Sequence, residues 1–128
     1  MTAKYNVISK SNPRNPNAPK RYYPSIKTTN RTTLRQLSEE IADISTVSPP
    51  DIIAVLESLL MLIPQKLEDG HVVELGDFGS FLLRIRSEGA DTPEGVTARS
   101  IKQVLVRFNP GQRFKQALRR IAFEKHPG

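Results

Sequence analysis

The tripeptide Asp77-Phe78-Gly79 is the first place where residue types and spacing could carry out chemistry. In protein kinases such an aspartate holds magnesium, but only together with a glycine-rich phosphate loop, a strand lysine and a catalytic loop. None of those motifs occurs here, and a chain of 128 residues is far too short for a kinase. A tight turn is the better interpretation, in which Gly76 and Gly79 supply positive φ angles and Phe78 enters the core.

The other signals for catalysis, metal binding or membrane insertion are weak. His71 and His126 have no partner at the spacing of a metal site or of a nucleophile and its base. The chain has no cysteine, so it has no disulfide framework and no thiolate ligand. No hydrophobic leader opens the sequence, and the longest apolar run, residues 59–63, is too short to span a bilayer. We therefore expect no enzymatic activity, metal, cofactor, small-molecule substrate or membrane partner.

Basic side chains follow a more coherent pattern. Between residues 81 and 108 two segments alternate apolar and polar residues, as expected of antiparallel strands with one solvent face. Arg84 and Arg86 on the first segment, and Arg99 and Arg107 on the second, fall on the polar face. Such a ribbon can lie along a nucleic-acid groove and contact phosphates. Arginine is also common at exposed strand positions, where it protects a sheet edge. Four arginines on one face nevertheless favour nucleic-acid binding.

The distribution of charge indicates the same kind of partner. Net charge is +6, and the sequence is basic at both ends and acidic in the middle. Residues 1–38 contain eight basic residues and no acid, residues 39–98 contain twelve acids and three basic residues, and residues 99–128 contain eight basic residues and one acid. Basic end segments attract a polyanion through counterion release. Alternatively, these charged residues only keep the surface of the protein solvated.

Two helices are expected ahead of these strands. The first begins near Thr33, which stands at capping-box spacing from a glutamine, and the second begins near Ser48, with Pro49 and Pro50 in its first turn. The second helix is apolar around nearly its whole circumference, which a chain of this size cannot cover internally. A dimer interface is the expected cover, in preference to a fully enclosed monomer core.

Three strands and a third helix complete an α+β order of α-α-β-β-β-α. A short strand is expected over residues 71–75, and residues 87–95 form a polar turn or arm tip. The third helix is expected to begin with Asn109 as its cap and Pro110 in its first turn, and to continue as far as Lys125. Its expected apolar stripe comprises Phe114, Ala117, Leu118 and Ile121.

Residues 1–31 form a separate basic segment that is rich in proline and asparagine. Its prolines exclude a helix, but residues 5–9 and 21–27 can be extended, the latter only at a sheet edge because of Pro24. We expect a tail that adds one extra strand to the body and leaves the proline-rich part as a loop. The chain is thus expected to divide into an extension, 1–31, and a folded domain, 32–128.

The order of elements and two motifs resemble the HU/IHF family of bacterial histone-like DNA-binding proteins. The motifs are Gly76-Asp77-Phe78-Gly79-Ser80-Phe81 and Arg107-Phe108-Asn109-Pro110-Gly111, and the resemblance covers roughly residues 32–124. It implies an HU/IHF-like fold: a helical hairpin, a three-stranded antiparallel sheet with a β-arm, and a C-terminal helix. It also implies an intertwined homodimer, or a heterodimer, whose two arms wrap the minor groove and can kink the duplex with a proline wedge.

The resemblance further implies which residues contact DNA. Pro93 corresponds to the wedge at the arm tip. The implied basic contacts of the arms, saddle and last helix are Arg84, Arg86, Arg99, Lys102, Arg107, Arg113 and Lys115. The tip departs from the family pattern, because Glu88, Asp91 and Glu94 stand where basic residues are usual and would repel phosphate.

The N-terminal extension resembles that of the HU-like subgroup of Bacteroidetes, in which a tail of the Tyr-Asn-Pro-Lys-Tyr-Tyr-Pro type precedes the helices. In this chain Tyr22 and Tyr23 stand among Lys20, Arg21 and Lys27, an arrangement that could add DNA contacts. Alternatively, the two tyrosines only pin the tail to the body.

The sequence therefore predicts an architectural protein that binds and condenses double-stranded DNA as a dimer, with little sequence preference, at the nucleoid in the cytoplasm. Two alternatives stay open. A structural or adaptor protein of the same fold, with weak or no DNA binding, would account for the acidic arm tip. Binding of RNA or single strands through the tail would account for its tyrosines among basic residues.

Overall fold

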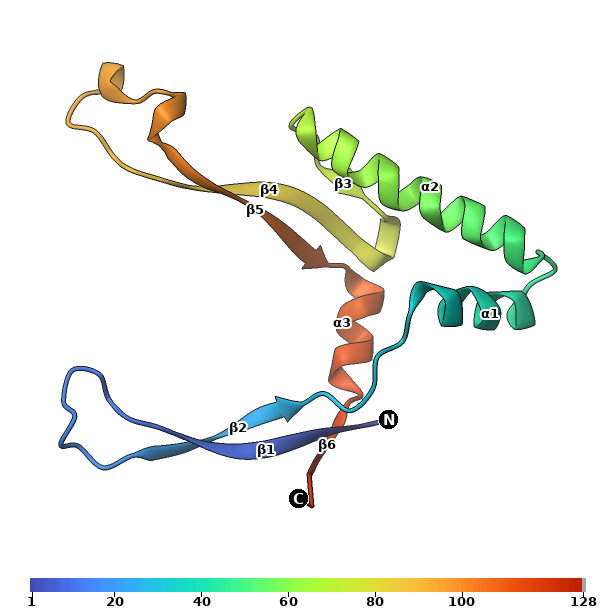
Figure 1. The fold of residues 1–128 in the computed structure, drawn as a ribbon, viewed down its shortest axis with the longest axis horizontal. Helices are drawn as coiled ribbons and strands as arrows, with labels where there is room; N and C mark the ends of the chain where they lie inside the picture. The colour runs from blue at the N-terminus through green and yellow to red at the C-terminus, as the bar shows by residue number, and fades with distance from the viewer. Residues whose placement is uncertain (128) are drawn as a thin grey trace. The chain divides into compact units, whose positions relative to one another are not determined.

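The computed structural model describes residues 1–127, which fold into two compact units (Figure 1). Met1–Thr33 and the segment from Ala117 onward form one unit, here called the N-terminal unit, and Leu34–Gln116 form the other, here called the central unit. Among the described residues, no helix combines the length and the apolar character that a membrane span requires.

The N-terminal unit is a three-stranded sheet with the order β2-β1-β6. Strands β1 (Thr2–Lys10) and β2 (Arg21–Lys27) form a long antiparallel hairpin, and β6 (Ala122–Lys125) pairs with β1 in parallel (Figure 1). The loop of the hairpin contains a tight turn in which the Arg14 amide donates to Asn12 Oδ1 at 2.9 Å. As expected from Pro24, β2 lies at the edge of the sheet.

This sheet corrects two expectations from the sequence. The extension contributes two strands instead of one, because residues 21–27 pair with β1 over its length. The third helix ends at Arg119 instead of continuing to Lys125, and residues 122–125 are extended. Residues 122–125 are extended because they pair with the free edge of β1, a segment distant in sequence. The amide of Ala122 donates to the carbonyl of Met1 at 3.1 Å, and the amide of His126 donates to the carbonyl of Tyr5 at 2.8 Å.

The central unit begins with the expected helical hairpin of α1 (Leu34–Ile44) and α2 (Pro49–Glu68). Pro49 and Pro50 occupy the first turn of α2, as predicted. Ser48 precedes them with an extended backbone, but its hydroxyl donates to Asp51 Oδ2 at 2.9 Å and does not cap a backbone amide. Ser38 of α1 is fully buried and donates to the carbonyl of Arg35 at 2.6 Å.

The sheet of the central unit is antiparallel, with the order β3-β4-β5, as predicted. Its strands are β3 (Val73–Glu74), β4 (Gly79–Ser87) and β5 (Ile101–Pro110). Helix α3 (Gln112–Arg119) follows β5. Asn109 and Pro110 therefore end a strand and do not open the helix, because they pair with Ser80 and Gly79 of β4.

A cluster of four phenylalanines fixes the junction of sheet and helix. The ring of Phe108 lies 5.4 Å from Phe78, 4.9 Å from Phe81 and 5.5 Å from Phe114, measured between centroids. Phe78 is still 45% exposed, so it caps the cluster and is not enclosed by it. Tilted and edge-on rings at these separations attract each other beyond their buried area.

Two glycines allow the backbone to close over this cluster. Gly79 follows the short 3-10 turn Gly76–Phe78 with φ = 148°, and a Cβ there would lie 2.5 Å from the Asn109 carbonyl oxygen and 2.7 Å from the Phe108 ring. The Gly111 amide donates to the Phe78 carbonyl at 2.9 Å, and a Cβ on Gly111 would collide with the backbone of Asp77. The turn and the end of β5 can approach this closely only without side chains.

Gly79→Ala should lower the free energy of unfolding by about 2 kcal/mol or more, because backbone strain and overpacking each cost about 1–3 kcal/mol. Urea denaturation measures the change. Gly89→Ala is the matched control, since Gly89 lies in open space without a positive φ angle, and it should leave the midpoint nearly unchanged. Equal midpoints for both variants would contradict this account of the turn.

Candidate nucleic-acid interface

The β4–β5 ribbon presents arginines on one face. The strand register pairs Leu82 with Arg107, Arg84 with Leu105, and Arg86 with Gln103, and directly paired residues point to the same side of a sheet. Arg84, Arg86 and Arg107 therefore share a face, and all of them are exposed. The opposite face carries the apolar pairs that continue from the phenylalanine cluster.

The fourth arginine of the expected ribbon is not on a strand. Arg99 lies in the 3-10 turn Ala98–Ser100, so the expectation that it belongs to the second strand is wrong. Thr97 and Ser100 explain the difference, because the Thr97 amide donates to the Ser100 hydroxyl at 3.2 Å and the Ser100 amide donates to the Thr97 carbonyl at 2.9 Å. This reciprocal capping stops the strand pairing before it reaches Arg99.

Lys102 lies at the irregularity of the register, beside the last pairs of the ribbon. Its ammonium group is 3.5 Å from Glu88 Oε2, and both side chains are more than half exposed. An exposed ion pair contributes little to stability. It nevertheless means that an acid from the arm tip lies beside one of the expected DNA contacts.

The arm tip consists of two short 3-10 turns, and the first of them, Pro93–Gly95, begins at the expected wedge proline (Figure 1). Its geometry is closed by the Gly95 amide, which donates to Thr92 Oγ1 at 3.2 Å. Pro93 is exposed. The acids of the tip are exposed as well, and they are Glu88, Asp91 and Glu94.

Nearer the body, an asparagine orients one arginine of the ribbon. Arg107 Nε donates to Asn109 Oδ1 at 2.9 Å, which fixes the guanidinium on the outer face. The spacing of two residues along one strand, which puts both side chains on the same face, is the signal that could have revealed this contact. Arg113 and Lys115 of α3 are exposed, so their charged ends are accessible to a phosphate.

The N-terminal sheet has a basic face of its own. Cross-strand pairing brings Lys4 opposite Lys27 and Lys10 opposite Arg21, on the same face as Tyr23. The ammonium of Lys10 lies 5.6 Å from the centre of the Tyr23 ring, within cation–π range. The sequence had singled out Lys20, Arg21 and Lys27. It missed Lys4 and Lys10, although their period-two spacing in residues 2–10 was a usable signal.

A site for metal-dependent chemistry is not found in residues 1–127: no group of three or more His, Asp or Glu side chains there could hold an ion. Asp77 lies in the turn beside the phenylalanine cluster, as the structural interpretation of the tripeptide predicted. What the described geometry offers is two exposed basic surfaces on sheets.

Comparison with known proteins places this geometry in a family. A family model described as HU domain fused to wHTH, Ig, or glycine-rich motif (HU-HIG) matches residues 1–125. The integration host factor subunit alpha of Aliivibrio fischeri is 33% identical over 101 residues, which cover 73% of this chain and 97% of that relative. The chain therefore belongs to the HU/IHF family. Members of this family are architectural proteins, which confirms the expectation that the chain is not an enzyme.

Solved structures confirm the HU/IHF-like fold. A proposed DNA-binding protein from Bacteroides vulgatus superposes with a TM-score of 0.68 at 12% identity and covers 99% of this chain, which spans only 50% of that protein. A mutant HU from Thermotoga maritima (TM-score 0.51, 21% identity) covers 68% of this chain and 99% of its own. Anabaena HU crystallised with DNA (TM-score 0.54, 23% identity) covers 68% of this chain and 97% of its own. The Bacteroides structure extends the likeness of fold over nearly the whole chain, the N-terminal extension included.

One acid interrupts the basic face of the N-terminal sheet and provides a test of its electrostatics. Lys4 Nζ donates to Glu124 Oε2 at 2.6 Å, and this hydrogen bond, with the attraction of the two charges, lowers the pKa of Glu124 below its ordinary value of 4.5. Because the folded-state pKa is depressed, the stabilisation is present above the ordinary value and is lost as pH falls through the folded value.

Lys4→Met should therefore raise the pKa of Glu124 towards 4.5. Carbon-detected NMR titration of the carboxyl group measures the shift. Lys10→Met is the control, because Lys10 is also on β1 but its side chain is placed over Tyr23. A Glu124 pKa that is equally low in the Lys4 variant would show that another group holds the carboxylate.

Proposed function

We propose that this chain is an architectural protein that binds double-stranded DNA with little sequence preference, through the β4–β5 arms of a dimer. The observation that carries the proposal is the row of exposed arginines on one face of the ribbon, Arg84, Arg86 and Arg107. Arginines contact phosphates, which position a protein on the duplex but carry no sequence information. The family of the chain and the Anabaena HU–DNA crystal structure support the same partner.

The arm tip modifies this function. Pro93 is exposed at the start of its 3-10 turn and is available as a wedge, but the acids around it would be repelled by phosphates. We infer that strands β4 and β5, between the body and the acidic tip, and helix α3 provide most of the binding energy. The bend produced by the proline should accordingly be modest.

The proposal of a dimer rests on the apolar side chains of the central unit that remain exposed. Among the described residues, only Ile52 and Leu67 are buried apolar side chains. The apolar face of the ribbon continues from the phenylalanine cluster into residues that are exposed, including Val104 (59%) and Val106 (62%). Full burial of one such side chain contributes about 1.5–3 kcal/mol, so covering this face in a second copy would be strongly favourable.

Helix α2 presents the same kind of surface. An open apolar groove of about 460 Å³ runs between α2 and the sheet. Its apolar lining is Leu60, Ile63, Pro64, Leu67, Phe81, Leu83, Val104 and Val106. Other side chains of α2 are also exposed, among them Val55 (66%) and Met61 (57%). An intertwined homodimer, or a heterodimer with a related chain, would fill the groove and cover the helix.

A protein with these properties would condense DNA at the nucleoid in the cytoplasm. The competing function is that of a structural or adaptor dimer with weak or no DNA binding. The observation that favours it is the cluster of exposed acids at the arm tip. The two functions differ in whether Arg84 and Arg86 contribute to DNA binding.

Replacement of both Arg84 and Arg86 by alanine should weaken duplex binding and flatten its salt dependence. The slope of log K against log salt should fall by about 0.9 for each phosphate that the variant no longer neutralises. An equilibrium titration with duplexes of about 30–40 base pairs, three to four helical turns, at two salt concentrations measures both effects. Linear, nicked and cruciform forms of the duplex would test bending by the tip.

The charge-matched control is the double variant Arg35→Ala, Lys66→Ala, which removes two exposed basic residues from α1 and α2. It should leave the slope nearly unchanged. If the arginine variant binds the duplex as tightly as the wild type, the adaptor function is favoured over the architectural one.

Val104→Asp should dissociate the dimer, because the carboxylate would have to be buried in the apolar interface. Sedimentation equilibrium should give twice the chain mass of 14.4 kDa for the wild type and a lower mass for the variant. Val96→Asp is the control, since Val96 is equally exposed (58% against 59%) but lies between the two turns of the arm tip. A wild type that stays at the single-chain mass at all concentrations would contradict the dimer, whether or not the variant folds.

A further inference from the structure

The two units of the chain carry charges of opposite sign. The N-terminal unit contains ten Lys and Arg against one Glu, a net charge of +9. The central unit, which holds the β4–β5 arm, contains nine Lys and Arg against twelve Asp and Glu, a net charge of −3. The N-terminal unit, which does not contain the arm, therefore attracts a polyanion more strongly than the central unit does.

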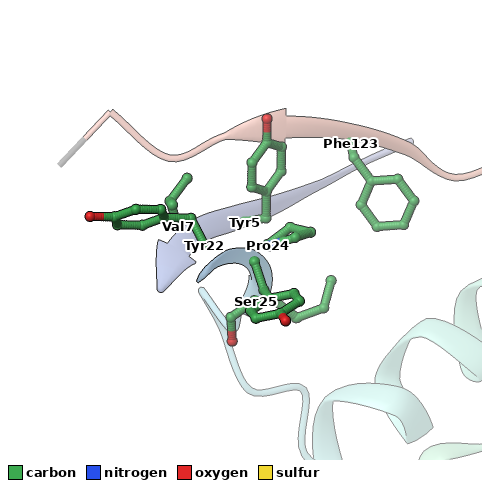
Figure 2. Close-up of a pocket in the computed structure, with 8 residues that line it drawn as sticks. Tyr5, Val7, Tyr22, Pro24, Ser25 and Phe123 are labelled. Carbon is green, nitrogen blue, oxygen red and sulfur yellow. The ribbon is translucent and has the colours of Figure 1, made fainter. Parts of the chain in front are cut away.

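The sheet of the N-terminal unit has an aromatic, apolar face opposite its basic face. The register of β1 and β2 places Tyr5 opposite Ile26 and Val7 opposite Pro24, with Tyr22 on the same side. Strand β6 adds Phe123 beside β1. Figure 2 shows Tyr5, Val7, Tyr22, Pro24 and Phe123 on these strands. They line a groove of about 710 Å³.

The rings of this groove are largely uncovered. Tyr22 is 71% exposed and Phe123 is 60% exposed, as is Ile26. Exposed apolar surface on a small, otherwise polar unit marks a binding site. Lys125 of β6 pairs with Tyr5 and so lies on the face of the groove, whereas the register places Arg21 and Lys27 on the opposite, basic face. Among the described residues Lys125, which is exposed, forms no ion pair.

The occupant of the groove must satisfy both observations. An intact duplex presents its phosphates but hides the faces of its bases, so it would leave the rings without a partner. A protein segment could cover the rings, but the charge of +9 favours a polyanion. A single nucleic-acid strand offers phosphates and exposed base faces together, and base–aromatic stacking with cationic flanks is how sequence-tolerant single-strand sites work.

We propose that the N-terminal sheet is a binding site for single-stranded DNA. Bases stack on the rings of Tyr5, Tyr22 and Phe123, and a phosphate of the same strand lies against Lys125 on this face of the sheet. DNA as the polymer rests on the proposed function of the arms, but the site itself uses none of their residues.

The composition of the chain provides a direct signal for this site. All three tyrosines, Tyr5, Tyr22 and Tyr23, lie in β1 and β2, and the chain has no tryptophan. Intrinsic fluorescence therefore reports on the N-terminal sheet alone. Titration of the full-length protein with a thymidine oligonucleotide should quench this fluorescence through stacking, whereas a duplex that binds the arms should quench it much less.

The double variant Tyr22→Ala, Phe123→Ala should weaken single-strand binding about thirtyfold or more, since each lost stack weakens binding about fivefold or more. Anisotropy of labelled oligonucleotides measures the Kd for the single strand and for a duplex of the same length. The duplex Kd should not change. Val72→Ala, Val96→Ala is the control, because it truncates two similarly exposed side chains of the central unit, and it should change neither Kd.

Three results would overturn the proposal. An unchanged single-strand Kd in the tyrosine–phenylalanine variant would show that the rings do not stack on bases. An equal loss of duplex and single-strand binding would assign the face to the duplex. Tighter binding of a uridine oligonucleotide would make RNA the ligand. Failure of the proposed function of the arms can be distinguished from these results. It would appear as a duplex Kd that does not change when Arg84 and Arg86 are replaced.

Discussion

The close approach of the Gly76–Phe78 turn to the end of β5 is the constraint on which the central unit depends. Gly79 and Gly111 let two backbone segments pass within the space that a Cβ would occupy, and the rings of Phe78, Phe108 and Phe114 meet above them. This junction sets the register in which Gly79 pairs with Pro110, and the register then determines the face of every residue along the ribbon. The row of exposed arginines and the apolar face are therefore two results of one backbone contact.

The same register gives the ribbon two surfaces of different chemistry. One face carries arginine, which suits a phosphate backbone, and the other carries valine, leucine and isoleucine, which need an apolar cover. A monomer of this unit cannot supply the cover, because α2 is itself apolar around most of its surface and only Ile52 and Leu67 are buried among the described apolar residues. Assembly and DNA binding would thus use opposite faces of the same two strands, so one need not compete with the other.

Charge is separated between the units in a way that the fold alone would not require. The central unit has the family's arm but a net negative charge, and its tip carries acids beside Pro93 and Lys102. The N-terminal unit is small, strongly basic and aromatic. Within this family the extension therefore need not be a passive tail. Its sheet carries rings on one face, with Lys125 beside them, and further cations on the other.

Local pattern was sufficient for much of this protein. Apolar periodicity and Pro49-Pro50 predicted α1 and α2, alternation predicted β4 and β5, and the glycines around Phe78 predicted the turn, because each of these signals acts over a few neighbouring residues. Tertiary structure decided what depends on distant partners. Residues 122–125 became a strand because β1 offered them a free edge, and Asn109 and Pro110 stayed in β5 because β4 paired with them. Likewise, the tyrosines and phenylalanine of the N-terminal sheet form one groove only because β1, β2 and β6 meet from opposite ends of the chain, a contact that no local sequence pattern encodes.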